Sequence, residues 1–99
     1  MKRVMVRYRV RPDAVERNEE LVRAVYASLA ELARADFTYA THKLDDGVSF
    51  VHLAAYEGES PLPSVPAFQA FTSGIRERCD EPPVVSELEE VGAYGRPPT

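Results

Sequence analysis

The segment at residues 36–57 constrains the fold of this chain more than any other part of its sequence. Asp46-Gly47 stands between two runs of alternating side chains, and such a pair supplies the positive φ angles that a two-residue hairpin loop needs. With this pair as the loop, counting outward places Thr41 opposite His52. A shift of one residue would exchange the two faces of the hairpin, so each assignment of a side chain to a face depends on this turn.

The predicted register divides the hairpin side chains between two faces. His52 and His42 fall on opposite faces, with His42 expected to face the helices or the strand edge. The two histidines therefore cannot hold one metal ion together, and we expect no metal site within one chain. Three further pairs are predicted on the face of His52: Phe37 with Tyr56, Tyr39 with Ala54, and Lys43 with Phe50.

Alternation continues in two flanking segments. Residues 2–11 alternate between valine or tyrosine on one side and methionine or arginine on the other. This pattern is typical of a half-buried strand, and Pro12 ends it. Residues 84–93 alternate as well and predict a last strand.

Two helices are predicted between these strands. Residues 13–34 carry an apolar stripe at spacings of three and four, with Asp13 as the N-cap and Glu16 completing a capping box. A second helix is predicted from residue 64 or 65 to residue 80, with Pro82-Pro83 as its end.

Length and composition limit the classes of function. The 99 residues predict one domain, residues 1–94, followed by a flexible tail at 95–99. The net charge is −4 and no broad basic footprint is present, so we expect no nucleic-acid partner. No apolar run predicts a membrane span or a signal peptide. The single cysteine permits no intrachain disulfide, which favours a reducing, cytoplasmic location.

The predicted order of elements is β-α-β-β-α-β. Two right-handed crossovers of this kind give an α+β, ferredoxin-like fold, in which a four-stranded antiparallel sheet of order 4-1-3-2 carries both helices on one face. The other face then has no cover. We expect Tyr39, Phe50, His52 and Tyr56 on that uncovered face, buried against a second copy of the chain in a homodimer.

Four stretches of the chain match the pattern of a known family. They are Val6-Arg-Tyr-Arg-Val10-Arg-Pro, Asn18-Glu-Glu-Leu-Val22, Leu44-Asp-Asp-Gly-Val48-Ser-Phe-Val-His-Leu53, and Phe68-Gln-Ala-Phe71 followed by Gly74-Ile-Arg-Glu-Arg-Cys79. Through them the sequence resembles the dimeric α/β-barrel superfamily and, within it, the antibiotic-biosynthesis-monooxygenase-like (ABM-like) domains. The resemblance covers residues 3–93. None of the stretches is a catalytic signature, so the resemblance concerns fold and dimerisation more than chemistry.

The resemblance implies a pocket in each protomer, between the open sheet face and the helices or loops. The activities that it implies include cofactor-independent oxygenation of phenols or quinols, haem degradation and isomerisation. Haem-degrading members use an Asn, a Trp and a His. This chain has no Trp, and its one Asn, Asn18, lies in the first predicted helix, which disfavours haem degradation. We therefore expect no cofactor.

His52 is the candidate catalytic residue. A histidine with a near-neutral pKa could deprotonate a phenol or quinol, and the resulting anion could react with oxygen directly. Tyr39 shares the face of His52 and is the candidate positioning group. The alternative for His52 is a buried structural histidine, hydrogen-bonded to Thr41 or across a dimer interface.

Four aromatic residues are candidates for the ligand pocket, each with a structural alternative. Phe50 and Tyr56 line either an aromatic pocket or the dimer interface. Phe68 and Phe71 belong to the apolar stripe of the second helix, and either of them could also form a pocket wall.

Arg7 is the one charged candidate for the pocket. Together with Arg9 it could bind an anionic group of a ligand. The alternative is pairing across the sheet with Glu87 and Glu89 of the last strand, which alternate in the same way.

These observations lead to three function hypotheses. The first is a homodimeric, cofactor-independent monooxygenase-like enzyme acting on a small aromatic or quinone-type molecule. The second is a non-enzymatic dimeric module that binds a small apolar ligand or stabilises a partner. The sequence shows no second polar catalytic partner for His52, which favours this second hypothesis slightly. The third, an isomerase, is not separable from the first without substrates.

Overall fold

The computed structural model describes residues 1–95, so the tail predicted at 95–99 lies outside the described residues except for Gly95. Short 3₁₀ turns precede α1 and α2, at Pro12–Ala14 and Leu62–Ser64. The strands and helices follow one another in the order β1 (Lys2–Val10), α1 (Val15–Leu32), β2 (Phe37–Lys43), β3 (Ser49–Tyr56), α2 (Pro66–Ser73), α3 (Ile75–Arg78) and β4 (Cys79–Leu88).

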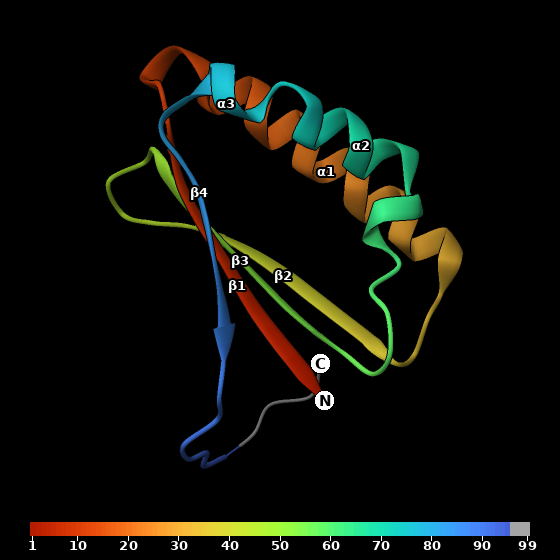
Figure 1. The fold of residues 1–99 in the computed structure, drawn as a ribbon. Helices are drawn as coiled ribbons and strands as arrows, with labels where there is room; N and C mark the ends of the chain where they lie inside the picture. The colour runs from red at the N-terminus through yellow and green to blue at the C-terminus, as the bar shows by residue number, and fades with distance from the viewer. Residues whose placement is uncertain (96–99) are drawn as a thin grey trace.

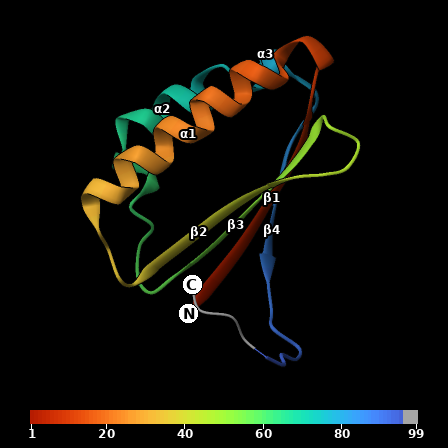
Figure 2. The ribbon, with the colours of Figure 1, turned by 180° about the vertical axis from the view of Figure 1, so that it is seen from behind.

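The four strands form one antiparallel sheet in the order β2-β3-β1-β4. This is the predicted order 4-1-3-2, so the predicted topology is confirmed. All helical segments of residues 1–95 lie on one side of the sheet, and within these residues no element covers the opposite side in either view (Figures 1 and 2). The fold is therefore the expected α+β, ferredoxin-like arrangement.

The register of the hairpin is the predicted one, although its turn is different. Thr41 pairs with His52, and the other three predicted pairs are also present. However, residues 44–48 connect the strands, and Gly47 is the one turn residue with a positive φ, of 76°. The carboxylate of Asp46 accepts hydrogen bonds from the backbone N–H groups of Val48 and Ser49, at 3.0 and 2.8 Å, and from the Ser49 hydroxyl. The turn is thus held by an aspartate side chain rather than by two residues of positive φ.

The helices cover the face that carries His52, which corrects the expectation that this face is open. We call it the inner face. Tyr8 pairs with Phe50 and Val6 with His52 across β1 and β3, so these side chains share one side of the sheet. Tyr8 and Phe50 are 2% exposed and belong to the core under the helices.

The opposite side, the outer face, carries the residues that alternate with these. Leu53, Val84 and Leu88 are large apolar side chains exposed there, and the alternation places Arg7 on the same side. His42 also lies on the outer face, in the edge strand β2, so of its two expected positions the one toward the helices is wrong. The prediction that the two histidines lie on opposite faces is confirmed.

The first helix begins later than its capping pattern predicted. Asp13 lies in the 3₁₀ turn that precedes α1, and Ala14 occupies the N-cap position without a side-chain cap. The carboxylate of Asp13 instead pairs with Arg11 at 3.4 Å. Ala33 ends α1 in the left-handed region, at φ 51°, and its N–H donates to the carbonyl of Leu29.

The second helix breaks at Gly74, and the chain enters the sheet earlier than predicted. Cys79, expected on the helix, is the first residue of β4, and Pro82-Pro83 lie inside this strand. Proline has no N–H for the strand ladder, so it is confined to edge strands and bulges. Here β4 is the edge strand, and its register with β1 shifts between the partners of Arg7 and Arg9, where the prolines stand.

Candidate functional site

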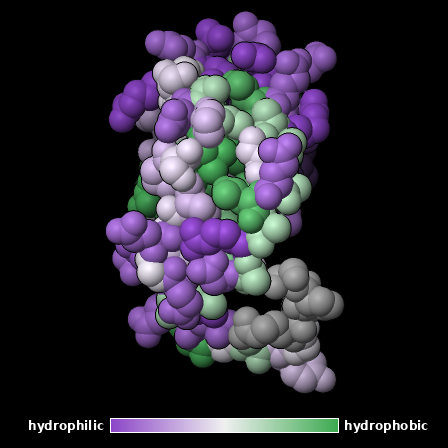
Figure 3. All heavy atoms as spheres, turned by 90° about the vertical axis from the view of Figure 1, so that its right-hand side faces the viewer, coloured by the Kyte–Doolittle hydropathy of each residue, from purple (hydrophilic) through white to green (hydrophobic). Residues whose placement is uncertain are grey.

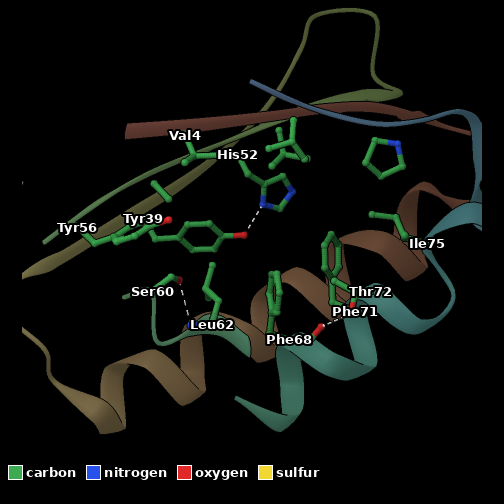
Figure 4. Close-up of a pocket in the computed structure, with 14 residues that line it drawn as sticks. Val4, Tyr39, His52, Tyr56, Ser60, Leu62, Phe68, Phe71, Thr72 and Ile75 are labelled. Carbon is green, nitrogen blue, oxygen red and sulfur yellow. Dashed lines mark hydrogen bonds between the residues drawn. The ribbon is translucent and has the colours of Figure 1, made fainter. Parts of the chain in front are cut away.

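A cavity of about 250 Å³ lies between the inner face and the segment α2–α3. In Figure 4, side chains from the sheet and side chains from α2 point toward one another across it. Figure 3 shows hydrophobic residues gathered in the middle of one side of the molecule, with hydrophilic residues around them. The lining is mostly apolar, with a few polar groups: Val4, Val6, Tyr39, His52, Ala54, Tyr56, Ser60, Leu62, Phe68, Phe71, Thr72, Ile75, Pro83 and Val85.

His52 is 4% exposed and is hydrogen-bonded through both ring nitrogens. The hydroxyl of Tyr8 lies 2.8 Å from Nε2. On the other side of the ring, the hydroxyl of Tyr39 lies 2.7 Å from Nδ1, and Thr41 Oγ1 lies 3.0 Å from the same nitrogen. His52 thus has several polar partners, and its burial and its hydrogen bond to Thr41 are those expected in the structural alternative.

The hydrogen bonds continue behind Tyr8 into the protein. Asn18 Nδ2 donates to the hydroxyl of Tyr8 at 2.9 Å, and Arg78 Nε donates to Asn18 Oδ1 at 3.2 Å. Asn18 lies in α1 and is fully buried. One continuous chain of hydrogen bonds therefore connects Arg78 to Tyr39 at the cavity wall.

Arg78 is buried without an acidic partner among residues 1–95. Its Nη2 donates to the backbone carbonyl of Phe71 at 2.6 Å, and the guanidinium lies 5.3 Å from the centre of the Phe71 ring. An added Cβ at Gly74 would approach Arg78 Nη1 to 3.3 Å, so this glycine leaves room for the guanidinium. The positive charge is accommodated by dipoles and an aromatic face rather than by a carboxylate.

Burial sets the protonation states of the site. Removal from water lowers the pKa of His52 from 6.5 to about 4, because it disfavours the charged imidazolium. Burial raises the pKa of the Tyr8 and Tyr39 hydroxyls above the ordinary value for tyrosine. At pH 7 all three groups are therefore neutral, and the chain of hydrogen bonds carries its only formal charge at Arg78.

The structure brings together most of the residues that the sequence singled out. His52, Tyr39, Tyr56, Phe68 and Phe71 line the same cavity, drawn from β2, β3 and α2 (Figure 4).

Two of the predicted pocket residues lie elsewhere. Phe50 is in the core behind the cavity, with its ring stacked on that of Tyr8 at 5.6 Å. Arg7 lies on the outer face and does not line the cavity. The predicted cross-strand pairing is present for Arg9, but its partner is Glu81, at 3.2 Å, because antiparallel pairing places Glu87 opposite Val4.

Sequence reasoning missed Tyr8, Asn18 and Arg78. Two of them stand in rows of apolar positions: Tyr8 in the alternating row of β1, and Asn18 four and seven residues before Val22 and Val25. A polar residue at a position that the pattern assigns to the core requires a buried partner. That requirement is the signal that could have found this network.

Residues 1–95 hold neither a cluster of metal ligands nor a membrane-spanning helix. No group of three or more His, Cys, Asp or Glu side chains could hold a metal ion. None of the helices is long and apolar enough to cross a membrane.

Solved structures with the same fold are numerous. Comparison of the sequence with protein-family models and with curated proteins found no significant match. Rv0793 from Mycobacterium tuberculosis superposes with a TM-score of 0.73 at 20% identity, covering 95% of this chain and 98% of that chain. An antibiotic biosynthesis monooxygenase has a TM-score of 0.73 at 14% identity, covering 93% of this chain and 100% of that chain.

A third structure carries a stated chemistry. SnoaB, a cofactor-independent oxygenase from Streptomyces nogalater, superposes with a TM-score of 0.68 at 14% identity, covering 96% of this chain and 97% of that chain. The resemblance read from the residues thus agrees with the comparison of folds. The chain has the ferredoxin-like fold of the antibiotic-biosynthesis-monooxygenase-like domains.

Proposed function

We propose that this protein is a cofactor-independent, monooxygenase-like enzyme that acts on a small aromatic or quinol-type molecule. The observation that carries the proposal is the hydroxyl of Tyr39, which stands at the wall of an apolar cavity and is held at 2.7 Å by buried His52. An apolar cavity with a few convergent polar groups is the usual form of a small-molecule site. The fold is shared with a cofactor-independent oxygenase, which supports the same reaction class.

We propose roles for His52 and Tyr39 that are the reverse of those expected from the sequence. Both ring nitrogens of His52 are already hydrogen-bonded to protein groups, so a substrate in the cavity meets Tyr39 first. In the proposed reaction the Tyr39 hydroxyl donates to the substrate oxygen as that oxygen becomes anionic. Donors fixed in a dry site stabilise such charge more strongly than water does. His52 acts through Tyr39 and holds it in place.

The proposed reaction balances without an external reductant. An activated ring carbon, present as CH₂ in the keto form of the substrate, loses a proton to water, and the carbanion adds to O₂. The resulting peroxide anion takes a proton from water and then loses water, so that R₂CH₂ and O₂ give R₂C=O and H₂O. The substrate supplies all the electrons, and the apolar cavity admits both an aromatic ring and O₂.

Oxygen consumption with a panel of hydroquinones, naphthols and anthrones tests the proposal. Tyr39→Phe should lower kcat/KM by roughly 100-fold or more, the usual loss when one donor to a developing oxyanion is removed. Tyr26→Phe is the matched control: it removes a phenol that is hydrogen-bonded to Thr41 at 2.8 Å and does not line this cavity. Equal activity of Tyr39→Phe and the wild type would refute the proposed role of Tyr39. If no compound of the panel supports oxygen uptake by the wild type, the proposal that the protein is an oxygenase is refuted.

One observation favours a second function, a small-ligand-binding module without turnover. Among the described residues, no cavity-lining histidine or carboxylate has a free basic atom that points at a substrate, because both nitrogens of His52 are occupied. Such a module would show thermal stabilisation by aromatic ligands and no oxygen uptake. Stabilisation accompanied by uptake would instead support the enzyme.

We also propose that the chain works as a homodimer that buries its outer face. Leu53, Val84 and Leu88 are 37%, 64% and 38% exposed on this side of the sheet. A small domain that leaves one sheet face without a cover gains stability by burying it. Sedimentation equilibrium should give twice the chain mass at micromolar concentration, and a stable monomer there would contradict the proposal.

A further inference from the structure

The chain of hydrogen bonds that ends at Tyr39 has a fixed direction, and Arg78 sets it. A guanidinium has donors and no acceptor, so the atom of Asn18 that faces Arg78 Nε at 3.2 Å must be the carbonyl oxygen. The amide nitrogen of Asn18 then faces Tyr8 and donates to its hydroxyl oxygen at 2.9 Å.

The direction passes from Asn18 through Tyr8 to His52. Because the Tyr8 oxygen accepts from Asn18, the hydroxyl hydrogen of Tyr8 has Nε2 of His52 as its partner, at 2.8 Å. Nε2 must then carry no hydrogen. The opposite direction would leave that hydroxyl hydrogen without an acceptor in a residue that is 2% exposed, which disfavours it by roughly fivefold or more.

The neutral ring of His52 therefore carries its hydrogen on Nδ1. Nδ1–H donates to the Tyr39 oxygen at 2.7 Å and shares this hydrogen with Thr41 Oγ1 at 3.0 Å. The Tyr39 hydroxyl has no other hydrogen-bonding side chain among the described residues. Its own hydrogen cannot point at His52, so it points toward the cavity that Tyr39 lines.

We propose that Arg78 and Asn18 are positioning residues that make Tyr39 a hydrogen-bond donor toward the cavity, so that the site selects aromatic molecules with an accepting oxygen. Quinones, aryl ketones and phenolates belong to this class, whereas aromatic molecules that offer only an N–H donor do not. The inference rests on the proposed function in one respect, the use of this cavity as the ligand site. The positive charge of Arg78 lies at the start of the chain, and each bond polarises the next one in the same sense.

One isosteric substitution should reverse the whole chain. In Asn18→Asp the carboxylate only accepts, so it takes a hydrogen bond from Arg78 and another from the Tyr8 hydroxyl. The Tyr8 oxygen then accepts from Nε2–H of His52, and Nδ1 accepts from the Tyr39 hydroxyl. Tyr39 would present lone pairs to the cavity instead of its hydrogen. The substitution also gives the buried Arg78 a charged partner, which favours an intact fold.

The first test measures the tautomer of His52 without any ligand, by ¹⁵N NMR of the ring nitrogens, with His42→Gln to assign the signals. The wild type should show a pyrrole-like Nδ1 and a pyridine-like Nε2, and Asn18→Asp should show the reverse. Arg78→Lys keeps a donor to Asn18 and should retain the wild-type pattern, whereas Arg78→Met should give a mixture. A pyridine-like Nδ1 in the wild type would overturn the proposal. If Asn18→Asp does not fold, the wild type and the two Arg78 variants decide the question.

The second test measures ligand selection with three probes of the same shape. 1-Indanone offers an acceptor, indole offers a donor, and indene offers neither. The wild type should bind 1-indanone about threefold to tenfold more tightly than indene, the usual effect of one hydrogen bond, and should not favour indole. Asn18→Asp should favour indole over 1-indanone. A wild type that prefers indole, or a preference that Asn18→Asp leaves unchanged, would overturn the proposal.

The two tests separate this inference from the proposed function. Failure of the whole oxygenase panel together with an Nδ1–H tautomer would refute the enzyme and leave the positioning role of Arg78 and Asn18 in place. Oxygen uptake together with an Nε2–H tautomer would support the enzyme and refute the positioning role of Arg78 and Asn18.

Discussion

The two faces of the sheet differ in how their polar groups are satisfied. On the inner side, His52 of the sheet and the fully buried Asn18 of α1 have hydrogen-bond partners, and no buried side-chain nitrogen or oxygen among the described residues lacks one. On the outer face, arginines stand beside exposed Leu53, and Arg9 forms an exposed ion pair with Glu81. The buried polar groups of the inner face are satisfied within one chain, whereas the outer face exposes Leu53, Val84 and Leu88.

This difference places chemistry and association on opposite sides of the same strand. In β3, Phe50 and His52 point toward the helices, while Leu53 points away from them. Changes at alternate positions of one strand should therefore affect different properties. Four measurements test this distinction.

The largest effect is expected from the core side of β3. Phe50→Ala should lower the free energy of unfolding by about 3–5 kcal/mol, because it removes a ring that is 2% exposed and stacked on Tyr8. Leu53→Ala, on the outer face, should cost clearly less when measured on the monomer. Urea denaturation compares the two variants, and equal losses would contradict the distinction between the faces.

The next effect is the pH dependence that His52 contributes. Its pKa is about 4 in the folded chain and near 6.5 when unfolded, so the unfolded chain binds more protons between these values. The contribution is fully present above pH 6.5 and is lost as the pH falls from 6.5 to about 4, by about 3 kcal/mol in total. His52→Gln should remove this part of the profile. His42→Gln is the control on the outer face and leaves His52 in place, so a changed profile there would argue against the assignment.

Association should respond to the outer face alone. Leu53→Glu introduces a charge that dimerisation would bury, and the dimer dissociation constant should rise roughly tenfold or more. The Tyr39 site lies on the other face, so ligand binding by the monomer should persist. Sedimentation equilibrium gives the first quantity and calorimetry the second. An unchanged dissociation constant would show that the dimer interface does not include Leu53.

The smallest effect is expected from the exposed ion pair. A double-mutant cycle with Arg9→Ala and Glu81→Ala should give a coupling energy of about 0.2–1 kcal/mol that decreases with added salt. The side chains are 43% and 60% exposed, so water screens their attraction. A coupling well above this range would show that the outer face is more ordered than its exposure indicates.

The sequence predicted the topology and the hairpin register, and it misassigned the covered face. The register was predictable because the strand pairing is centred on Asp46-Gly47, although the turn itself differs from the predicted one. Which face the helices cover depends on how β1 pairs with β3. Local sequence patterns carry no information about that pairing. In the structure Val6 pairs with His52 and Tyr8 with Phe50, and this pairing places His52 under the helices.

The candidate site was predicted only in part for a similar reason. His52 and Tyr39 stood out because of their residue types. Asn18 and Arg78 matter because a buried donor and a buried acceptor meet across 60 residues of sequence, and no local pattern fixes that meeting. The break at Gly74 also divides the predicted second helix into α2 and α3 and places Arg78 at the end of α3, which a continuous helical pattern did not predict.

The two prolines in β4 have a consequence for behaviour at high concentration. An edge strand with free N–H groups can be extended by a strand of another molecule, and repeated addition leads to aggregates. Pro82 and Pro83 lie within this edge strand and lack those groups, and the register shift beside them interrupts the regular ladder. This edge is therefore a poor template for a neighbouring chain. The apolar outer face can remain available for association while growth of the sheet by strand addition at β4 is blocked.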